Sequence, residues 1–180
     1  MSRTVVAAAI AALVVVVGGG VAAYLALSGD GSSDAASTGG TSTGPTTMTI
    51  RVLASVTTAR PVDLPPRNVV NKGDRVFVES RLTNAVEQFG RPKGSIVGVD
   101  YSTITYLSER DRLVNAQITL PGGGLHLRGK LAAPRPDQPD AVIKIPIISG
   151  TRAFAGATGT AESRSAQGSQ TLNVYHLRLP

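Results

Sequence analysis

Short stretches in which apolar and polar residues alternate occupy most of the 180-residue chain after residue 47. Alternation with a period of two is typical of a β-strand that buries one face. Gly, Pro or Asp separates the stretches from one another, and 48–180 lacks the 3.6-residue apolar period of an amphipathic helix. The pattern predicts eight strands, at 48–56, 74–82, 96–107, 112–120, 125–131, 141–148, from Thr160 onward, and at 171–179.

Eight short strands in about 130 residues predict an all-β domain folded as an eight-stranded antiparallel β-barrel. The interior of a barrel of this size holds side chains or one small ligand. Because the last strand reaches the C-terminus, it can pair with the first strand and leave neither edge open.

The N-terminal segment has a different character. Val5–Leu27 is a run of 23 residues without a charged side chain, long enough for a transmembrane helix. Arg3 precedes the run and Asp30 follows it, so the N-terminus is expected in the cytoplasm and the rest outside a single-pass cell-membrane anchor. Cleavage of a signal peptide near Val21-Ala22-Ala23, which would secrete the protein, is the alternative.

A linker is expected between the anchor and the barrel. Residues 28–47 are mostly Gly, Ser and Thr, a composition typical of a flexible tether. The sequence therefore predicts three parts: an anchor at 1–27, a linker at 28–47 and the barrel at 48–180. An extracytoplasmic domain without Cys is ordinary for a bacterium.

Composition excludes several chemistries. The chain has no Cys and two His, so we expect no disulfide, no thiol nucleophile, no metal centre and no cofactor. All but Arg3, Asp30 and Asp34 of the 18 Lys and Arg and 12 Asp and Glu lie in 48–180. Residues 48–180 therefore carry a net positive charge. Because the basic residues are scattered along the segment and the aromatic residues are few, a nucleic-acid partner is not expected.

Four motifs occur in the order and spacing of one known family. Residues 141–160 resemble a strand followed by GGTGAF and x-GA-x-G, and 73–82 resemble GD-x-V-x-F followed by Leu. Residues 120–129 resemble LPGG-x-I followed by Gly, and Tyr175 with Leu177 fits the closing strand. The chain thus resembles allene oxide cyclase-like and dirigent-like proteins over about 71–179. The resemblance implies an eight-stranded antiparallel barrel with a lipocalin-like (calycin) layout, and often a trimer.

The resemblance also indicates which family chemistry this chain lacks. The catalytic Glu and Asn of the plant cyclases would fall at Val52, Ala54 and Ser80, and a cavity Cys at Asp100. Since Val52 and Ala54 have no polar side chain, plant-type cyclase activity is not expected. Ser149 and Arg152 replace family glycines, and Arg152 is either a solvated turn residue or an anion contact at the barrel mouth.

Asp100 is the main candidate site residue. If the face of 96–106 that carries Ile96, Asp100 and Tyr106 points inward, the carboxyl lies in the barrel, where it needs a partner or a raised pKa. Otherwise, it lies on the outer face or at a wet rim. His126 and His176 are either structural or part of general acid–base chemistry. Ligand-binding candidates are Asp100, Tyr106, Ser80 and Arg152, and catalytic candidates are Asp100, His126 and Tyr106.

Three functions remain open from the sequence. The first is a tethered barrel that binds or steers a small apolar ligand in its lumen, the second an isomerase or cyclase with a different polar set, and the third a structural envelope protein with a filled barrel. We also expect self-association, as a trimer, because segments such as 141–148 are apolar on both faces.

Overall fold

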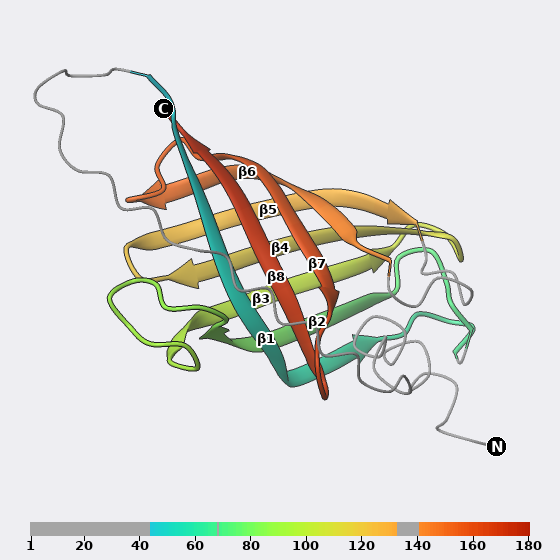
Figure 1. Cartoon of the computed structure of the whole chain (residues 1–180). Helices are drawn as coiled ribbons and strands as arrows, with labels where there is room; N and C mark the ends of the chain where they lie inside the picture. The colour runs from blue at the N-terminus through green and yellow to red at the C-terminus, as the bar shows by residue number, and fades with distance from the viewer. Residues whose placement is uncertain (1–43, 68, 133–140) are drawn as a thin grey trace, which may run out of the picture.

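A computed structural model describes residues 44–67, 69–132 and 141–180, which form eight antiparallel strands (Figure 1). The alternation seen in the sequence is the reason that these segments form strands, since inward side chains are buried and outward ones are wet. The strands are β1 (Thr46–Val62), β2 (Arg75–Asn84), β3 (Ile96–Tyr106), β4 (Asp111–Leu120), β5 (Gly123–Ala132), β6 (Ile143–Arg152), β7 (Thr158–Ser165) and β8 (Gln170–Leu179).

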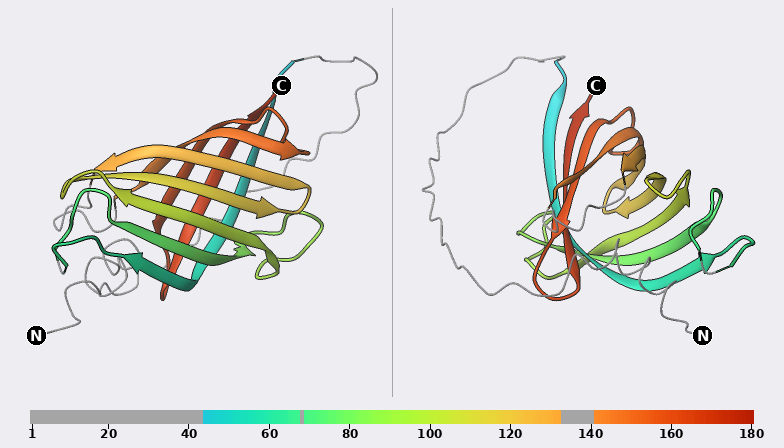
Figure 2. Two further views of the ribbon diagram at one scale, coloured as in Figure 1. Left: turned by 180° about the vertical axis from the view of Figure 1, so that it is seen from behind. Right: turned by 90° about the vertical axis from the view of Figure 1, so that its right-hand side faces the viewer.

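The strands close into a barrel in the order of the sequence. Each strand pairs with the next, and β8 pairs with β1, so that Ala54 lies opposite Leu82 on one side and Thr171 on the other. The walls are seen from the two sides in Figures 1 and 2, with β1, β8 and β7 nearest the viewer in Figure 1 and β2–β5 in the left panel of Figure 2. The predicted all-β, eight-stranded antiparallel barrel is therefore confirmed.

The two ends of the barrel differ. We call the end that carries the β2–β3, β4–β5 and β6–β7 connections the base, and the end that carries the β3–β4 and β7–β8 turns the mouth. The base is filled by a tight apolar core in which the largest side chains are almost completely buried; it includes Ile50, Val52, Leu82, Leu120, Leu125, Phe154 and Leu177. A second, smaller core of Val76, Ile104, Tyr106 and Val114 lies towards the mouth, so the part of the lumen between the two cores is where a ligand could bind.

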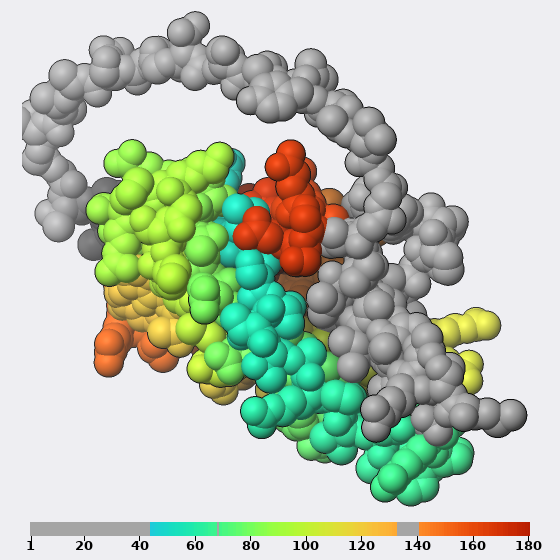
Figure 3. Space-filling model, turned by 90° about the horizontal axis from the view of Figure 1, so that it is seen from below, coloured from blue at the N-terminus to red at the C-terminus, as the bar shows by residue number. Residues whose placement is uncertain are grey.

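The β2–β3 loop is held against the base by Asn84, whose side chain is fully buried. Its amide Nδ2 donates to the carbonyl oxygens of Gln88 and Arg91, each at 2.9 Å, and the Gln88 amide Nε2 donates to the carbonyl oxygen of Arg51 at 2.6 Å. Figure 3 shows the lower side of the barrel, which β1 crosses, with the residues of this loop (lime) at one end. The buried amide thus fixes this loop without help from solvent.

The β6–β7 connection shows why the glycine motif is needed. A Cβ on Gly150 would lie 2.1 Å from the carbonyl oxygen of Phe154, so only glycine allows the chain to fold back there and bury the Phe154 ring in the base. β6 continues to Arg152, whereas the sequence predicted an end at Ser149-Gly150. Arg152 itself has a left-handed backbone with φ 56°.

Two strand details differ from the prediction. β1 extends to Val62 rather than residue 56, through an irregularity between Val56 and Thr58. In β3 a shift of register between Leu82 and Thr83 inverts the alternation at the first residues, so that Ile96 is 56% exposed and Val97 is buried. Strict alternation would put Ile96 on the same face as Asp100 and Tyr106, and the extra residue that breaks this alternation leaves no signal in the sequence.

The predicted anchor Val5–Leu27 and residues 28–43 of the linker lie outside the described residues. Within 44–67, 69–132 and 141–180, the structure contains no helix of the length and apolar character that a membrane span requires. The third predicted part, the barrel, begins with β1 at Thr46, two residues before its expected start.

Candidate functional site

A cavity with a volume of about 140 Å³ occupies the lumen between the packed base and the mouth. All eight strands contribute to its wall, and small side chains such as Ala54, Ala116 and Ala161 make room for it. The wall is mostly aliphatic, and Val56 and Ser169, which line it towards the mouth, are exposed. Its polar lining residues are Ser80, Asp100, Ser102, Ser163, Ser169, Thr171, Asn173 and Tyr175.

Asp100 points into this cavity from the middle of β3. It lies opposite Ser80 on β2 and Ile118 on β4, and its Oδ1 accepts a hydrogen bond of 2.6 Å from the Ser102 hydroxyl. Burial raises the pKa of Asp100 to about 6, and the hydrogen bond from Ser102 offsets part of that rise. The carboxyl therefore exchanges its proton close to neutral pH, which suits it to accept or donate a proton or a hydrogen bond.

The second notable group is the hydroxyl of Tyr175 on β8, which is buried and forms no hydrogen bond within the described ranges. Burial raises the pKa of Tyr175 strongly, the charge of Asp100 raises it further, and the nearby Asn173 side chain opposes the rise. Asn173 accepts a hydrogen bond of 2.7 Å from the Ser163 hydroxyl. The lumen thus holds a carboxyl and a neutral phenol that is free to donate a hydrogen bond.

The structure separates the three residues predicted as a catalytic set. Asp100 and Tyr106 share the inner face of β3 but lie six residues apart, roughly 20 Å along the strand. His126 lies between the inward Leu125 and Leu127, and its side chain contacts the Asn115 amide oxygen on the outer side of the sheet. Asp100, Tyr106 and His126 therefore do not form one site.

The other predicted residues lie in different places. Ser80 lines the cavity beside Asp100. Arg152 is exposed at the base of the barrel, a position that fits the solvated turn residue, the first of its two expected roles. His176 is exposed on β8, and its Nε2 lies 3.9 Å from a Glu162 oxygen. In the part of the chain that the structure describes, His, Cys, Asp and Glu side chains form no group of three that could hold a metal ion.

Asn173, Tyr175 and Arg112 are among the inward polar residues that sequence reasoning missed. Asn173 and Tyr175 have the same parity as the buried Leu177, and Arg112 has the same parity as Val114 and Ala116. Alternation alone could have placed them on inner faces. It could not show that the Tyr175 hydroxyl and two nitrogens of Arg112 would lack hydrogen-bond partners among the described residues, because that depends on several strands together.

Comparison with known proteins supports the fold. No family model and no curated protein matches the sequence. Among solved structures, the chain is similar to a pterocarpan synthase dirigent protein (17% identity, 82% of this chain and 98% of that one, TM-score 0.55) and to an exo-specific intermolecular Diels–Alderase (11% identity, 74% and 98%, TM-score 0.56).

Two further similar structures are a pyocyanin demethylase (16% identity, 72% of this chain and 99% of that one, TM-score 0.55) and a nonspecific heme-binding cyclase that catalyses a [4 + 2] cycloaddition (20% identity, 75% and 66%, TM-score 0.53). The chain thus has the barrel fold of the dirigent-like and cyclase barrels, as its motifs implied. Identities of this size establish the fold alone.

Replacement of Asp100 by Asn should change how stability depends on pH. The folded-state pKa of about 6 lies above the ordinary 3.8, so wild-type stability should fall as the pH rises from about 4 to about 6 and then level off. Asp100→Asn removes the charge, and it should be more stable than wild type above pH 7 by up to about 2–3 kcal/mol and nearly equal to it below pH 4.

Urea unfolding followed by circular dichroism at several pH values measures this difference. Glu79→Gln, on the outer face of the neighbouring strand, is the matched control and should keep the wild-type pH dependence. Identical pH profiles for Asp100→Asn and wild type would show that the carboxyl is not buried in the lumen.

Proposed function

We propose that the barrel binds a small, mostly apolar molecule in its lumen, oriented by the polar groups of the wall. The cavity of about 140 Å³ carries the proposal, because its wall is aliphatic apart from a few polar groups that include Asp100 and Tyr175. Apolar walls with few convergent polar groups are typical of small-molecule sites. A structural envelope protein with a filled barrel is disfavoured by the same cavity.

The wall also supports the absence of plant-type cyclase activity. Of the two β1 positions where that chemistry would need polar side chains, Val52 is buried in the base and Ala54 lines the cavity. β1 therefore brings neither a carboxylate nor an amide to the cavity from these positions.

An enzyme is the second candidate, and Asp100 favours it. A lumen carboxyl with a pKa of about 6, close enough to Tyr175 to influence its hydroxyl, can move a proton on a bound molecule and so catalyse an isomerisation or cyclisation. Four barrels of similar fold include a cyclase, a Diels–Alderase, a demethylase and a dirigent protein, so this fold accommodates both catalysis and steering.

Native mass spectrometry of the full chain in detergent tests ligand binding. We expect a co-purified small molecule on the wild-type barrel and a large loss of it in Ala116→Leu, which fills the cavity. Gln117→Leu, the next residue on β4 and exposed on the outer face, should retain the molecule. An empty wild-type barrel, or equal retention by both variants, would contradict the proposal.

The same measurement separates binding from catalysis. For a binding protein, wild type and Asp100→Asn should carry the same molecule. For an isomerase or cyclase, Asp100→Asn should retain a substrate that wild type converts, and the two molecules would have equal mass but different chromatographic retention.

We further propose that the barrel is tethered outside the cell membrane by Val5–Leu27. The supporting features are the uncharged run, the charges around it and the Gly/Ser/Thr-rich linker. Protease added to intact cells should cut the linker and release the barrel. Protection until lysis would contradict the orientation, and barrel found only in the medium with a new N-terminus after residue 23 would indicate a cleaved signal.

Self-association is the last part of this proposal, with a trimer expected from the resemblance. Three large apolar side chains on outer strand faces support it, namely Phe77 (42% exposed), Tyr101 (53%) and Ile148 (46%), together with Val142 (46%) immediately before β6. Residues 44–180 contain the complete closed sheet, so their sedimentation at micromolar concentration is the measurement. Tyr101→Lys should weaken the trimer and Tyr101→Phe should not, whereas a wild-type monomer would refute the expectation.

A further inference from the structure

Arg112 is a charged residue buried inside the barrel near the mouth. It is 6% exposed and shares the inner face of β4 with the buried Val114 and Ala116. Tyr106 lies directly opposite on β3, and the Arg112 Cζ is 5.0 Å from the centre of the Tyr106 ring. The ring supports the guanidinium from one side through a cation–π contact, which leaves its N–H donors available.

Two of these donor atoms form no hydrogen bond within the part of the chain that the structure describes. Arg112 Nε and Nη1 are both buried, and neither has a hydrogen-bond partner among the described residues. A buried guanidinium is normally paired with an acid or fully hydrogen-bonded, because removal of a charge from water is costly. An exception at the end of a ligand cavity suggests that the partner is a ligand.

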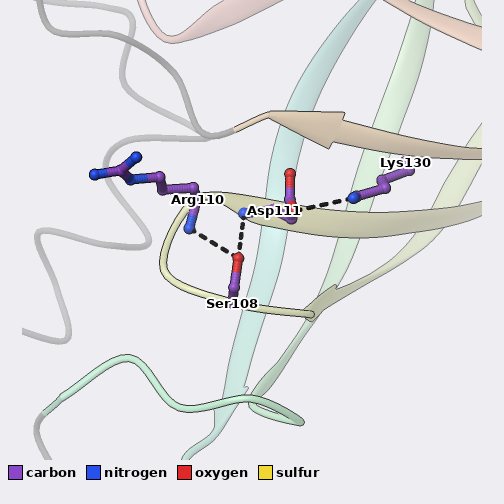
Figure 4. Close-up of polar contacts among 4 residues, drawn as sticks. All are labelled: Ser108, Arg110, Asp111 and Lys130. Carbon is purple, nitrogen blue, oxygen red and sulfur yellow. Dashed lines mark hydrogen bonds and ion pairs between the residues drawn. The ribbon is translucent and has the colours of Figure 1, made fainter.

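The acid next to Arg112 in the chain, Asp111, already has an ion-pair partner. Asp111 forms an ion pair of 2.9 Å with Lys130 across β4 and β5, beside a turn in which the Ser108 hydroxyl accepts hydrogen bonds from the backbone N–H groups of Arg110 and Asp111 (Figure 4). In this close-up, the Asp111 carboxylate and the Lys130 ammonium lie toward each other along the two strands. The Asp111 carboxylate therefore pairs with Lys130 and not with the neighbouring Arg112.

Two other acids do not pair with Arg112 either: Asp74 is hydrogen-bonded to the backbone, and Asp100 lies too far away. The Asp74 carboxylate accepts hydrogen bonds from the backbone N–H groups of Leu64 and Asn71, at 2.8 and 2.7 Å. Asp100 lies opposite Ile118, six residues along β4 from Arg112, or roughly 20 Å. None of these three acids neutralises the Arg112 guanidinium, so within the described residues they leave it able to bind an anionic ligand.

Arg112 is not part of the cavity wall, but two residues beside it are. Val114, two residues along β4, and Leu131, directly opposite Arg112 on β5, both line it. Two residues of a strand span roughly 7 Å, which a linker of a few bonds can cover. The cavity volume of about 140 Å³ is close to the ~150 Å³ of an apolar protein cavity that accepts benzene. One six-membered ring therefore fits the apolar part of the site.

We propose that the Arg112 guanidinium binds the carboxylate of a small ligand whose single apolar ring fills the cavity. This inference rests on the proposed lumen-binding function and adds the class of ligand, a monocyclic carboxylate with a short linker. The planar guanidinium suits a carboxylate better than a point charge would, and the dry surroundings strengthen the hydrogen bonds. The carboxylate lies toward the mouth and the ring toward Asp100 and Tyr175.

The test compares two ligands of the same shape that differ in charge. Isothermal titration calorimetry on the full chain in detergent measures binding of 3-cyclohexylpropanoate and of its neutral amide, 3-cyclohexylpropanamide. Wild type should bind the carboxylate at least tenfold more tightly than the amide. Arg112→Gln should weaken carboxylate binding about ten- to a hundredfold and leave amide binding nearly unchanged. Arg128→Gln, exposed on β5, is the control and should behave as wild type.

Folding is checked in the same samples. Arg112→Gln removes an uncompensated buried charge, so its thermal midpoint should equal or exceed that of wild type. A lower midpoint with an unchanged preference for carboxylate over amide would show that Arg112 only supports Tyr106, and it would overturn the inference.

Two other results would also overturn it. Equal wild-type affinity for the two ligands would leave lumen binding intact but remove the role of Arg112. Binding of neither ligand by wild type would reject this class of ligand. The proposed function itself is judged separately, by the molecule that co-purifies with the wild-type barrel and is lost in Ala116→Leu.

Discussion

Closure of the sheet between β1 and β8 is the constraint on which the rest of the structure depends. Once eight strands form a closed cylinder, alternate residues of every strand must point into one narrow lumen, and their summed volume decides whether it is filled. At the base the inward residues are large, as with Leu82 and Phe154, and the lumen is solid. Higher up, Ala54, Ala116 and Ala161 are too small to meet, and a cavity remains.

Polar groups inside such a lumen divide into two kinds. Asn84 and Asp74 are buried and hydrogen-bonded to the backbone, so they hold loops in place. The Tyr175 hydroxyl and two nitrogens of Arg112 are buried without partners in the described part of the chain. Structural polar groups are normally hydrogen-bonded. Of the two groups without partners, Tyr175 lines the cavity, and Arg112 lies beside two residues that line it, Val114 and Leu131. This division is the physical reason to regard the lumen as a binding site.

The sequence predicted the barrel because period-two alternation depends on each strand alone. The same parity correctly indicated that Asp100 could point inward, and it was available for Tyr175 and Arg112. It failed at the start of β3, where a shift of register placed Val97 inside and Ile96 outside. It also could not place His126 relative to Asp100, since both the cavity and the mouth are assembled from residues on different strands.

The separation of the polar groups along the lumen determines how a ligand could bind. Asp100 and Tyr175 lie in the middle of the barrel, whereas Arg112 lies towards the mouth, and the residues between them on the inner face of β4, Val114 and Ala116, are apolar. A molecule with one charged end can satisfy Arg112 in only one orientation, because reversal would bring its charge to an Asp100 carboxylate of like sign. That orientation presents the apolar end to a carboxyl whose pKa of about 6 allows it to hold or release a proton at neutral pH. In the proposed binding mode, the arrangement that orients the ligand would also bring one defined part of it to Asp100, so steering and proton transfer would require the same placement of the ligand in the lumen.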